Sequence, residues 1–76
     1  MNNKKRQKIK IAQEYLSQAS NIISDVLDEE QDCLDNMPEN LQSSDRCECM
    51  EIAVSKLEEA IESIEQAEES LTEAIG

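Results

Sequence analysis

The sequence has little of what β-sheets are built from. Its 76 residues include one aromatic side chain (Tyr15), one proline (Pro38), one glycine at the last position, and no histidine or tryptophan. Strands favour aromatic and β-branched residues, and tight hairpins need glycine. Good helix formers such as Ala, Leu, Glu and Gln are plentiful instead. The composition therefore predicts a single, small, all-α domain.

The residues that several kinds of chemistry need are also missing. There is no histidine and no glycine-rich phosphate loop. Carboxylates on solvated helix faces have no pocket to separate their pKa values for acid–base work. We therefore expect a protein that is not an enzyme and has no cofactor. The sequence also has no apolar run of about 18 residues, and no apolar segment follows the basic start as in a signal peptide. We expect a cytoplasmic protein that does not enter a membrane.

Acidic residues outnumber basic ones by 18 to 7, which gives a formal net charge of −11. Such a surface repels nucleic acid and anionic lipid and attracts basic proteins. We expect neither direct nucleic-acid binding nor membrane binding. A protein with a basic surface is the expected partner.

Apolar residues at alternating steps of three and four predict a first helix over residues 4–37. The predicted stripe is broken at Glu30 and flanked by Tyr15, Ile22, Leu27 and Leu34. Its members are Ile9, Ala12, Leu16, Ala19, Ile23, Val26, Cys33 and Met37.

Pro38 predicts the end of the first helix, because a residue before proline avoids helical geometry. A turn over 38–44 then leads to a second helix over 45–75. Ser43, Ser44 and Asp45 are the N-cap candidates, with Glu48 as a capping-box partner for Asp45. The second helix has alanines seven residues apart and a break at Glu68. Its stripe consists of these alanines, Ala53, Ala60, Ala67 and Ala74, together with Val54, Leu57, Ile61, Ile64, Leu71 and Ile75.

Two long helices and a short turn predict an antiparallel hairpin, with Ile9 beside Ile75. The arrangement would bring the five cations between Lys4 and Lys10 beside acidic residues of the second helix. The apolar stripes are wider than two helices can cover, and exposed apolar patches of this size are unusual for a monomer. We therefore expect a homo-oligomer, most simply a dimer that forms a four-helix bundle.

The cysteine-containing region has two chemical interpretations that we disfavour. A calcium loop beginning at Asp28 would place Cys33 where glycine is required. Zinc sites need four ligands, and Cys47 and Cys49 have only Cys33 as a further thiol. We expect no metal site. We expect a solvated helix end, with one of the two neighbouring thiols on the core side and the other partly exposed.

Carboxylates are the candidate partner-binding residues. They form a row on the second helix, where repulsion between like charges four residues apart costs about 0.2–0.5 kcal/mol per pair, and a corner at the end of the first helix. A row of anions suits a basic groove that normally holds nucleic acid, although acidic helices are also common simply because they are soluble. The candidates are Glu58, Glu62, Glu65, Glu69 and Glu73 in the row, and Asp28, Glu29, Asp32 and Asp35 in the corner.

The segment "DEEQDCLDNMPENLQSSDR", followed by "MEIAVSKLEEAIESIEQA", resembles a group of small acidic proteins from phages and mobile elements of Gram-positive bacteria. The resemblance is carried by Asp28–Gln31, Asp35–Pro38, Leu41, Gln42, Ser44 and Arg46. It implies a helical hairpin and an accessory phage or prophage role, without a particular activity. We expect a non-catalytic interaction module that inhibits a host nucleic-acid-binding or defence protein by charge mimicry. The alternative is a scaffolding bundle that assembles through its apolar stripe.

Overall fold

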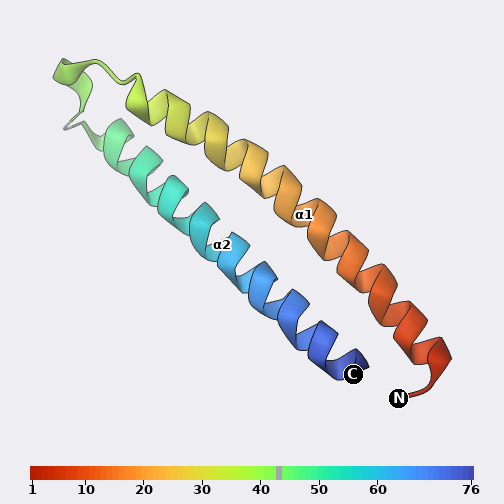
Figure 1. Cartoon of the computed structure of the whole chain (residues 1–76). Helices are drawn as coiled ribbons and strands as arrows, with labels where there is room; N and C mark the ends of the chain where they lie inside the picture. The colour runs from red at the N-terminus through yellow and green to blue at the C-terminus, as the bar shows by residue number, and fades with distance from the viewer. Residues whose placement is uncertain (43) are drawn as a thin grey trace.

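The computed structural model describes residues 1–42 and 44–76 as two long antiparallel helices joined by a short turn (Figure 1). Helix α1 spans Asn3–Asp35, the 3-10 helix η1 spans Glu39–Leu41, and helix α2 spans Asp45–Ile75. The rod measures 59 × 15 × 13 Å, with both termini at one end. No strand occurs among the described residues. The predicted all-α hairpin is confirmed.

Each long helix begins at a polar side chain that caps its first turn. The Oδ1 atom of Asn2 accepts a hydrogen bond from the backbone N–H of Lys5 at 2.9 Å. At α2, the Oγ atom of Ser44 accepts from the N–H of Cys47 at 3.3 Å. Ser44 has the extended backbone of a cap, whereas Asp45 already lies inside the helix. The predicted capping box between Asp45 and Glu48 is therefore wrong, and the candidate Ser43 lies outside the described residues.

Helix α1 ends at Asp35, slightly before the predicted position. The side chain of Asn36 donates from Nδ2 to the carbonyl of Asp32 at 2.8 Å, which satisfies one of the last carbonyls of the helix. Pro38 disfavours helical backbone at Met37, and the chain turns away there. The end of α1 is thus set jointly by the proline and by the asparagine that precedes it.

The two helices meet along a row of inward positions on each, which we call the seam. Cys47 and Val54 are buried, the other seam residues are half-buried, and the polar Gln13, Ser20, Glu30 and Glu68 are among them. The seam of α1 consists of Ile9, Gln13, Leu16, Ser20, Ile23, Leu27, Glu30, Leu34 and Met37. The seam of α2 consists of Cys47, Met50, Val54, Leu57, Ile61, Ile64, Glu68, Leu71 and Ile75.

The phase of the α1 seam differs from the predicted stripe. Leu27 and Leu34, expected as flanks, lie in the seam, whereas Ala12, Val26 and Cys33 are exposed. The predicted stripe mixed two rows that each alternate steps of three and four and lie one residue apart. Spacing alone does not distinguish such rows, because both satisfy the same periodicity.

Two hydrogen bonds between the helices show the antiparallel register near the termini. Arg6 donates from Nε to the backbone carbonyl of Ile75 at 3.2 Å, and Gln13 donates from Nε2 to the Oγ1 atom of Thr72 at 3.1 Å. Positive charge is favourable at a helix C-terminus, so Arg6 stabilises the end of α2 by binding the carbonyl of Ile75. No N-terminal cation forms an ion pair with an acidic residue of α2 in the described part of the chain, and Arg6 binds a backbone carbonyl instead.

Candidate functional site

The sides of the hairpin differ sharply in chemistry. A helix turns by about 100° per residue, so the residues that follow seam positions lie on one side and those that precede them on the other. Because the helices are antiparallel, the following residues of α1 and α2 share one face of the hairpin, which we call the acidic face. The preceding residues of both helices share the opposite side, which we call the open face.

The acidic face gathers carboxylates from both helices. There are nine such carboxylates, and all of them are exposed. Seven lie either in the half of the hairpin nearer the turn or at the centre of α2. Lys10 is the only cation among the following positions of the described helices. The carboxylates of this face are Glu14, Asp28, Asp35, Glu48, Glu51, Glu58, Glu62, Glu65 and Glu69.

Four of the five row residues predicted on α2 belong to the acidic face. Glu58, Glu62, Glu65 and Glu69 each follow a seam residue directly, so the structure brings them together on one side. Glu73 is also exposed but lies farther round the helix, away from the seam. The row is therefore a coherent surface, with Glu73 at its outer edge.

The predicted acidic corner is not a single cluster. Asp28 and Asp35 follow seam residues and join the acidic face, whereas Asp32 points outward from the hairpin. Glu29 precedes the seam residue Glu30 and therefore lies on the open face. Four carboxylates close in sequence are separated in this way because each step along the helix rotates the side chain by about 100°.

Few groups neutralise these carboxylates. Within the described chain, the only ion pair joins Lys56 and Glu59 at 2.9 Å, and both side chains are largely exposed. On the acidic face, Gln31 donates from Nε2 to Oδ1 of Asp35 at 3.0 Å. Neither Asp35 nor Glu39 forms an ion pair with Arg46 in the described residues. The acidic face thus presents nearly its full negative charge to solvent.

The neighbouring thiols of Cys47 and Cys49 divide as the sequence predicted, whereas Cys33, expected in the stripe of the first helix, is exposed. Cys47 is buried in the seam, and Cys49 is exposed. Burial, together with the charge of Glu51 and a 3.8 Å contact from Cys47 Sγ to Glu51 Oε1, raises the pKa of the Cys47 thiol. Residues 28–35 are helical, which a calcium loop would not be. The described residues contain no group of three potential metal ligands.

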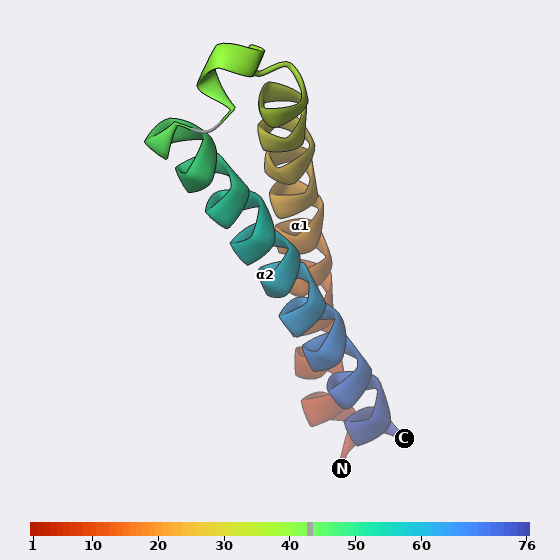
Figure 2. The ribbon, with the colours of Figure 1, turned by 90° about the vertical axis from the view of Figure 1, so that its left-hand side faces the viewer.

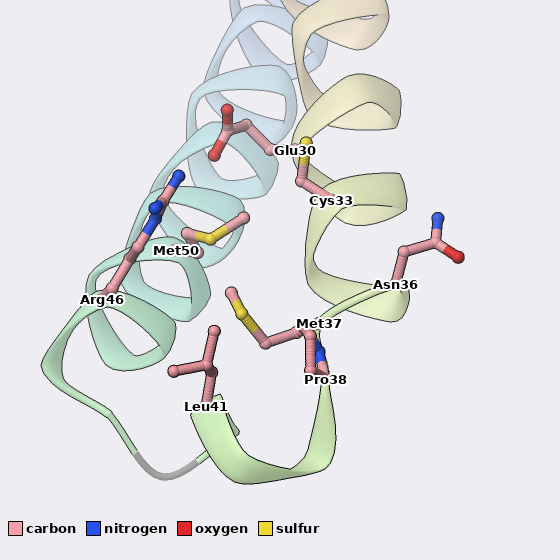
Figure 3. Close-up of a pocket in the computed structure, with 8 residues that line it drawn as sticks. All are labelled: Glu30, Cys33, Asn36, Met37, Pro38, Leu41, Arg46 and Met50. Atoms are coloured by element: carbon pink, nitrogen blue, oxygen red, sulfur yellow. The ribbon is translucent and has the colours of Figure 1, made fainter.

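In the view of Figure 2 the two helices are seen apart beside the turn and overlap toward the termini. An open hollow of about 440 Å³ lies beside the turn. Met37, Leu41 and Met50 point into the hollow, while Asn36 points away (Figure 3). The side chains of Glu30 and Arg46 extend toward one another at its rim. The lining also includes Cys33 and Pro38.

Glu48 and Glu51 were not among the candidate partner-binding residues predicted from the sequence. The sequence also did not predict that the polar residues Gln13 and Ser20 lie in the seam. Spacing alone does not find them, because large apolar residues occupy two rows of the same period on α1. Leu16, Leu27 and Leu34 share one row with Gln13 and Ser20, and that row excludes Ala12 and Val26.

Comparison of the chain with protein-family models, with curated proteins and with solved structures found no match in any of the three. Among the described residues, neither long helix combines the length and apolarity needed to cross a membrane. The geometry of the two faces is therefore the basis for inferring function.

Proposed function

We propose that this protein is a non-catalytic interaction module whose acidic face binds a basic surface on another protein. More specifically, we propose a phage or prophage protein that inhibits a host nucleic-acid-binding or defence protein by charge mimicry. The observation that carries the proposal is the placement of Asp28, Asp35 and the glutamates of α2 on one exposed face with almost no neutralising partner. The sequence resemblance to small acidic proteins from phages of Gram-positive bacteria supports a Gram-positive host.

The spacing of the carboxylates supports mimicry of a nucleic-acid backbone. Glu58, Glu62, Glu65 and Glu69 recur every three or four residues, or about 5 Å along the helix axis. The phosphates of one DNA strand recur about every 3.4 Å along the duplex axis. From Glu58 to Glu73 the row covers about 22 Å, the length of six or seven base pairs. A groove that holds a short stretch of duplex therefore meets a comparable line of charge.

The test uses immobilised protein to capture proteins from a Gram-positive lysate at low salt. Under the proposal, DNA-binding proteins are retained and are released as the salt rises from about 0.05 to 0.3 M, because screening weakens exposed charge pairs. Added duplex DNA also displaces them, and the chain inhibits their binding to DNA in a mobility-shift assay. Retention that neither salt nor DNA reduces would contradict charge mimicry.

Matched variants separate the acidic face from overall charge. The variant Glu58→Gln, Glu62→Gln and Glu65→Gln removes three charges from the face. The control Asp25→Asn, Glu39→Gln and Glu59→Gln removes three charges elsewhere. We expect about tenfold weaker partner binding for the face variant, since exposed pairs contribute about 0.2–1 kcal/mol each. Binding of the control should change little.

A scaffolding bundle is the second candidate, and a specific observation favours it. Tyr15, Ile22 and Val26 on α1 remain 68%, 64% and 41% exposed, which is unusual for large apolar side chains in one row. We propose that the protein self-associates through this row, in either version of its function. Apolar assembly would persist at salt concentrations that abolish binding through the acidic face.

A further inference from the structure

The open face has a composition that a second helical layer requires. On α1, the residues before seam positions alternate small and large in steps of three and four from Ala12 to Val26. This is a second seam, turned by about 100° from the first. Helices in a four-helix bundle contact two neighbours and need two such rows. The row consists of Ala12, Tyr15, Ala19, Ile22 and Val26, with Cys33 beyond Glu29.

The corresponding row on α2 is built from small side chains. Ala53, Ala60 and Ala67 are half-buried, and a single long side chain, Lys56, interrupts the small ones. The two rows of the open face thus differ in size, large on α1 and small on α2. The small residues of the row are Cys49, Ala53, Ala60, Ser63, Ala67, Ser70 and Ala74.

The charges on this face allow a second copy to approach. The chain carries a net charge of −11, so most of its surface repels another copy. Among the positions that precede seam residues within the helices, Glu29 is the only acid on the open face, against Lys8, Arg46 and Lys56. The open face is therefore the side on which two acidic chains meet with the least repulsion. No other protein is needed to explain its composition.

The chain exposes more surface than a compact monomer of its size, as expected for one half of a dimer. The chain exposes 5823 Å², whereas a compact monomer of its mass would expose about 4,700 Å². The open face follows the full 59 Å of a rod that is 15 Å across, and a stable interface typically buries about 800 Å² per partner.

We propose that two copies pack open face to open face with both turns at the same end. In this arrangement, a two-fold axis parallel to the helices places α1 of each copy against α2 of the other. Large side chains of α1, such as Tyr15 and Ile22, then meet the small ones of α2, such as Ala67 and Ala60. With the turns at opposite ends, α1 would pack on α1 and α2 on α2. The large row would then oppose itself, as would the small row, and the two helix pairs would need different spacings.

The same-end arrangement has two specific consequences. The antiparallel register of the hairpin places Cys33 of one copy level with Cys49 of the other near the turn. It also brings Glu29 of one copy within about one helical turn of Lys56 of the other, so the only acid on the open face gains a cation. This inference rests on the self-association in the proposed function but not on binding by the acidic face.

The test crosslinks two single-cysteine chains with a short bismaleimide. One chain keeps only Cys33 and the other only Cys49, with Ala at the remaining two cysteine positions. We expect a crosslinked dimer in the mixture of the two chains and little in either chain alone, because like cysteines lie diagonally across the bundle. A second mixture combines the Cys33 chain with a cysteine-free chain carrying Lys8→Cys. Efficient crosslinking there, without any between Cys33 and Cys49, would show the turns at opposite ends and overturn the arrangement.

Sedimentation tests whether the open face is the dimer interface, independently of how the two copies are oriented. The variant Tyr15→Glu with Ile22→Glu should weaken dimerisation at least about a hundredfold, because both residues lie at the centre of the interface. The control Glu62→Gln on the acidic face should leave the dimer intact. A wild-type chain that remains monomeric at all concentrations would overturn the inference entirely. If that monomer still binds DNA-binding proteins in a salt-sensitive way, the proposed function of the acidic face stands without it.

Discussion

Cys47 shows how a position in the seam changes the chemistry of one side chain. The residue is 3% exposed, and its thiol lies beside the carboxylate of Glu51. Two residues later, the thiol of Cys49 is exposed. Burial and a neighbouring negative charge both disfavour the thiolate of Cys47 and therefore raise its pKa.

The raised pKa of Cys47 predicts a loss of stability at alkaline pH. Below the usual thiol pKa of 9.0, the group is neutral in both the folded and the unfolded chain, and its full contribution is present. As the pH rises further, the unfolded chain ionises first, so the free energy of unfolding falls until the folded pKa is passed. Urea unfolding between about pH 8 and pH 10.5 measures the effect.

The variant Cys47→Ala isolates this contribution, because it removes the Cys47 thiol and leaves every other ionisable group in place. We expect the stability of Cys47→Ala to fall less steeply with pH than that of the wild type. Cys49→Ala should keep the steep dependence. Parallel curves for wild type and Cys47→Ala would contradict the assignment.

Glu30 is a half-buried carboxylate in a row of apolar seam residues. The variant Glu30→Leu should raise the free energy of unfolding by about 1 kcal/mol, because a leucine there is partly removed from water between Leu27 and Leu34. Thermal melting and urea unfolding provide the measurement. Glu62→Leu makes the same chemical change on the exposed acidic face and should give no comparable gain. An equal effect of the two variants would show that lost repulsion, rather than the seam, is responsible.

At the scale of the helix, local polar side chains decide where each element begins. Asn2 and Ser44 have extended backbone and accept hydrogen bonds from the first turns of α1 and α2. Ser44 also donates from its hydroxyl to the carbonyl of Leu41 at 2.6 Å, which connects η1 to the start of α2. The turn is therefore held by short-range bonds as well as by Pro38.

Loss of the α2 cap predicts a measurable destabilisation. The variant Ser44→Ala removes the acceptor for the N–H of Cys47 and should cost about 1 kcal/mol of folding free energy. Chemical unfolding followed by helical circular dichroism gives the value. The control Ser55→Ala lies in the exposed middle of α2 and should be neutral or stabilise by a few tenths of a kcal/mol. If both variants behaved alike, the hydrogen bond to Ser44 would not contribute to stability.

At the scale of the whole molecule, the hairpin has too little interior to be complete. Among the described residues, Cys47 and Val54 are the only buried apolar side chains. A small domain with so little burial is marginal on its own. Association of two hairpins would bury the large residues of the open face and supply the missing core.

Self-association predicts that thermal stability depends on protein concentration. A hundredfold rise in chain concentration should raise Tm by several degrees, because the dimer is favoured by mass action. Circular dichroism melts at a series of concentrations measure the shift. The variant Tyr15→Glu with Ile22→Glu should melt at a temperature that no longer varies. A wild-type Tm independent of concentration would indicate a stable monomeric hairpin.

Much of the fold follows from local sequence. Pro38 predicts the end of α1, Ser44 was among the predicted caps, and the abundance of helix formers predicts the helices between them. The short turn favours antiparallel packing. These features depend on a few neighbouring residues and on backbone preferences, which a sequence states directly.

The sequence by itself therefore determined two helices, their boundaries to within a few residues, and the row of glutamates along α2. Only the tertiary structure decided which of two equivalent rows on α1 faces α2, and with it which carboxylates share a face. The physical reason is that both rows have the same period, so the choice depends on packing against Cys47, Val54 and their neighbours across the seam. Once that choice is made, Asp28 and Asp35 join the acidic face, and Tyr15 and Ile22 are left on the open face.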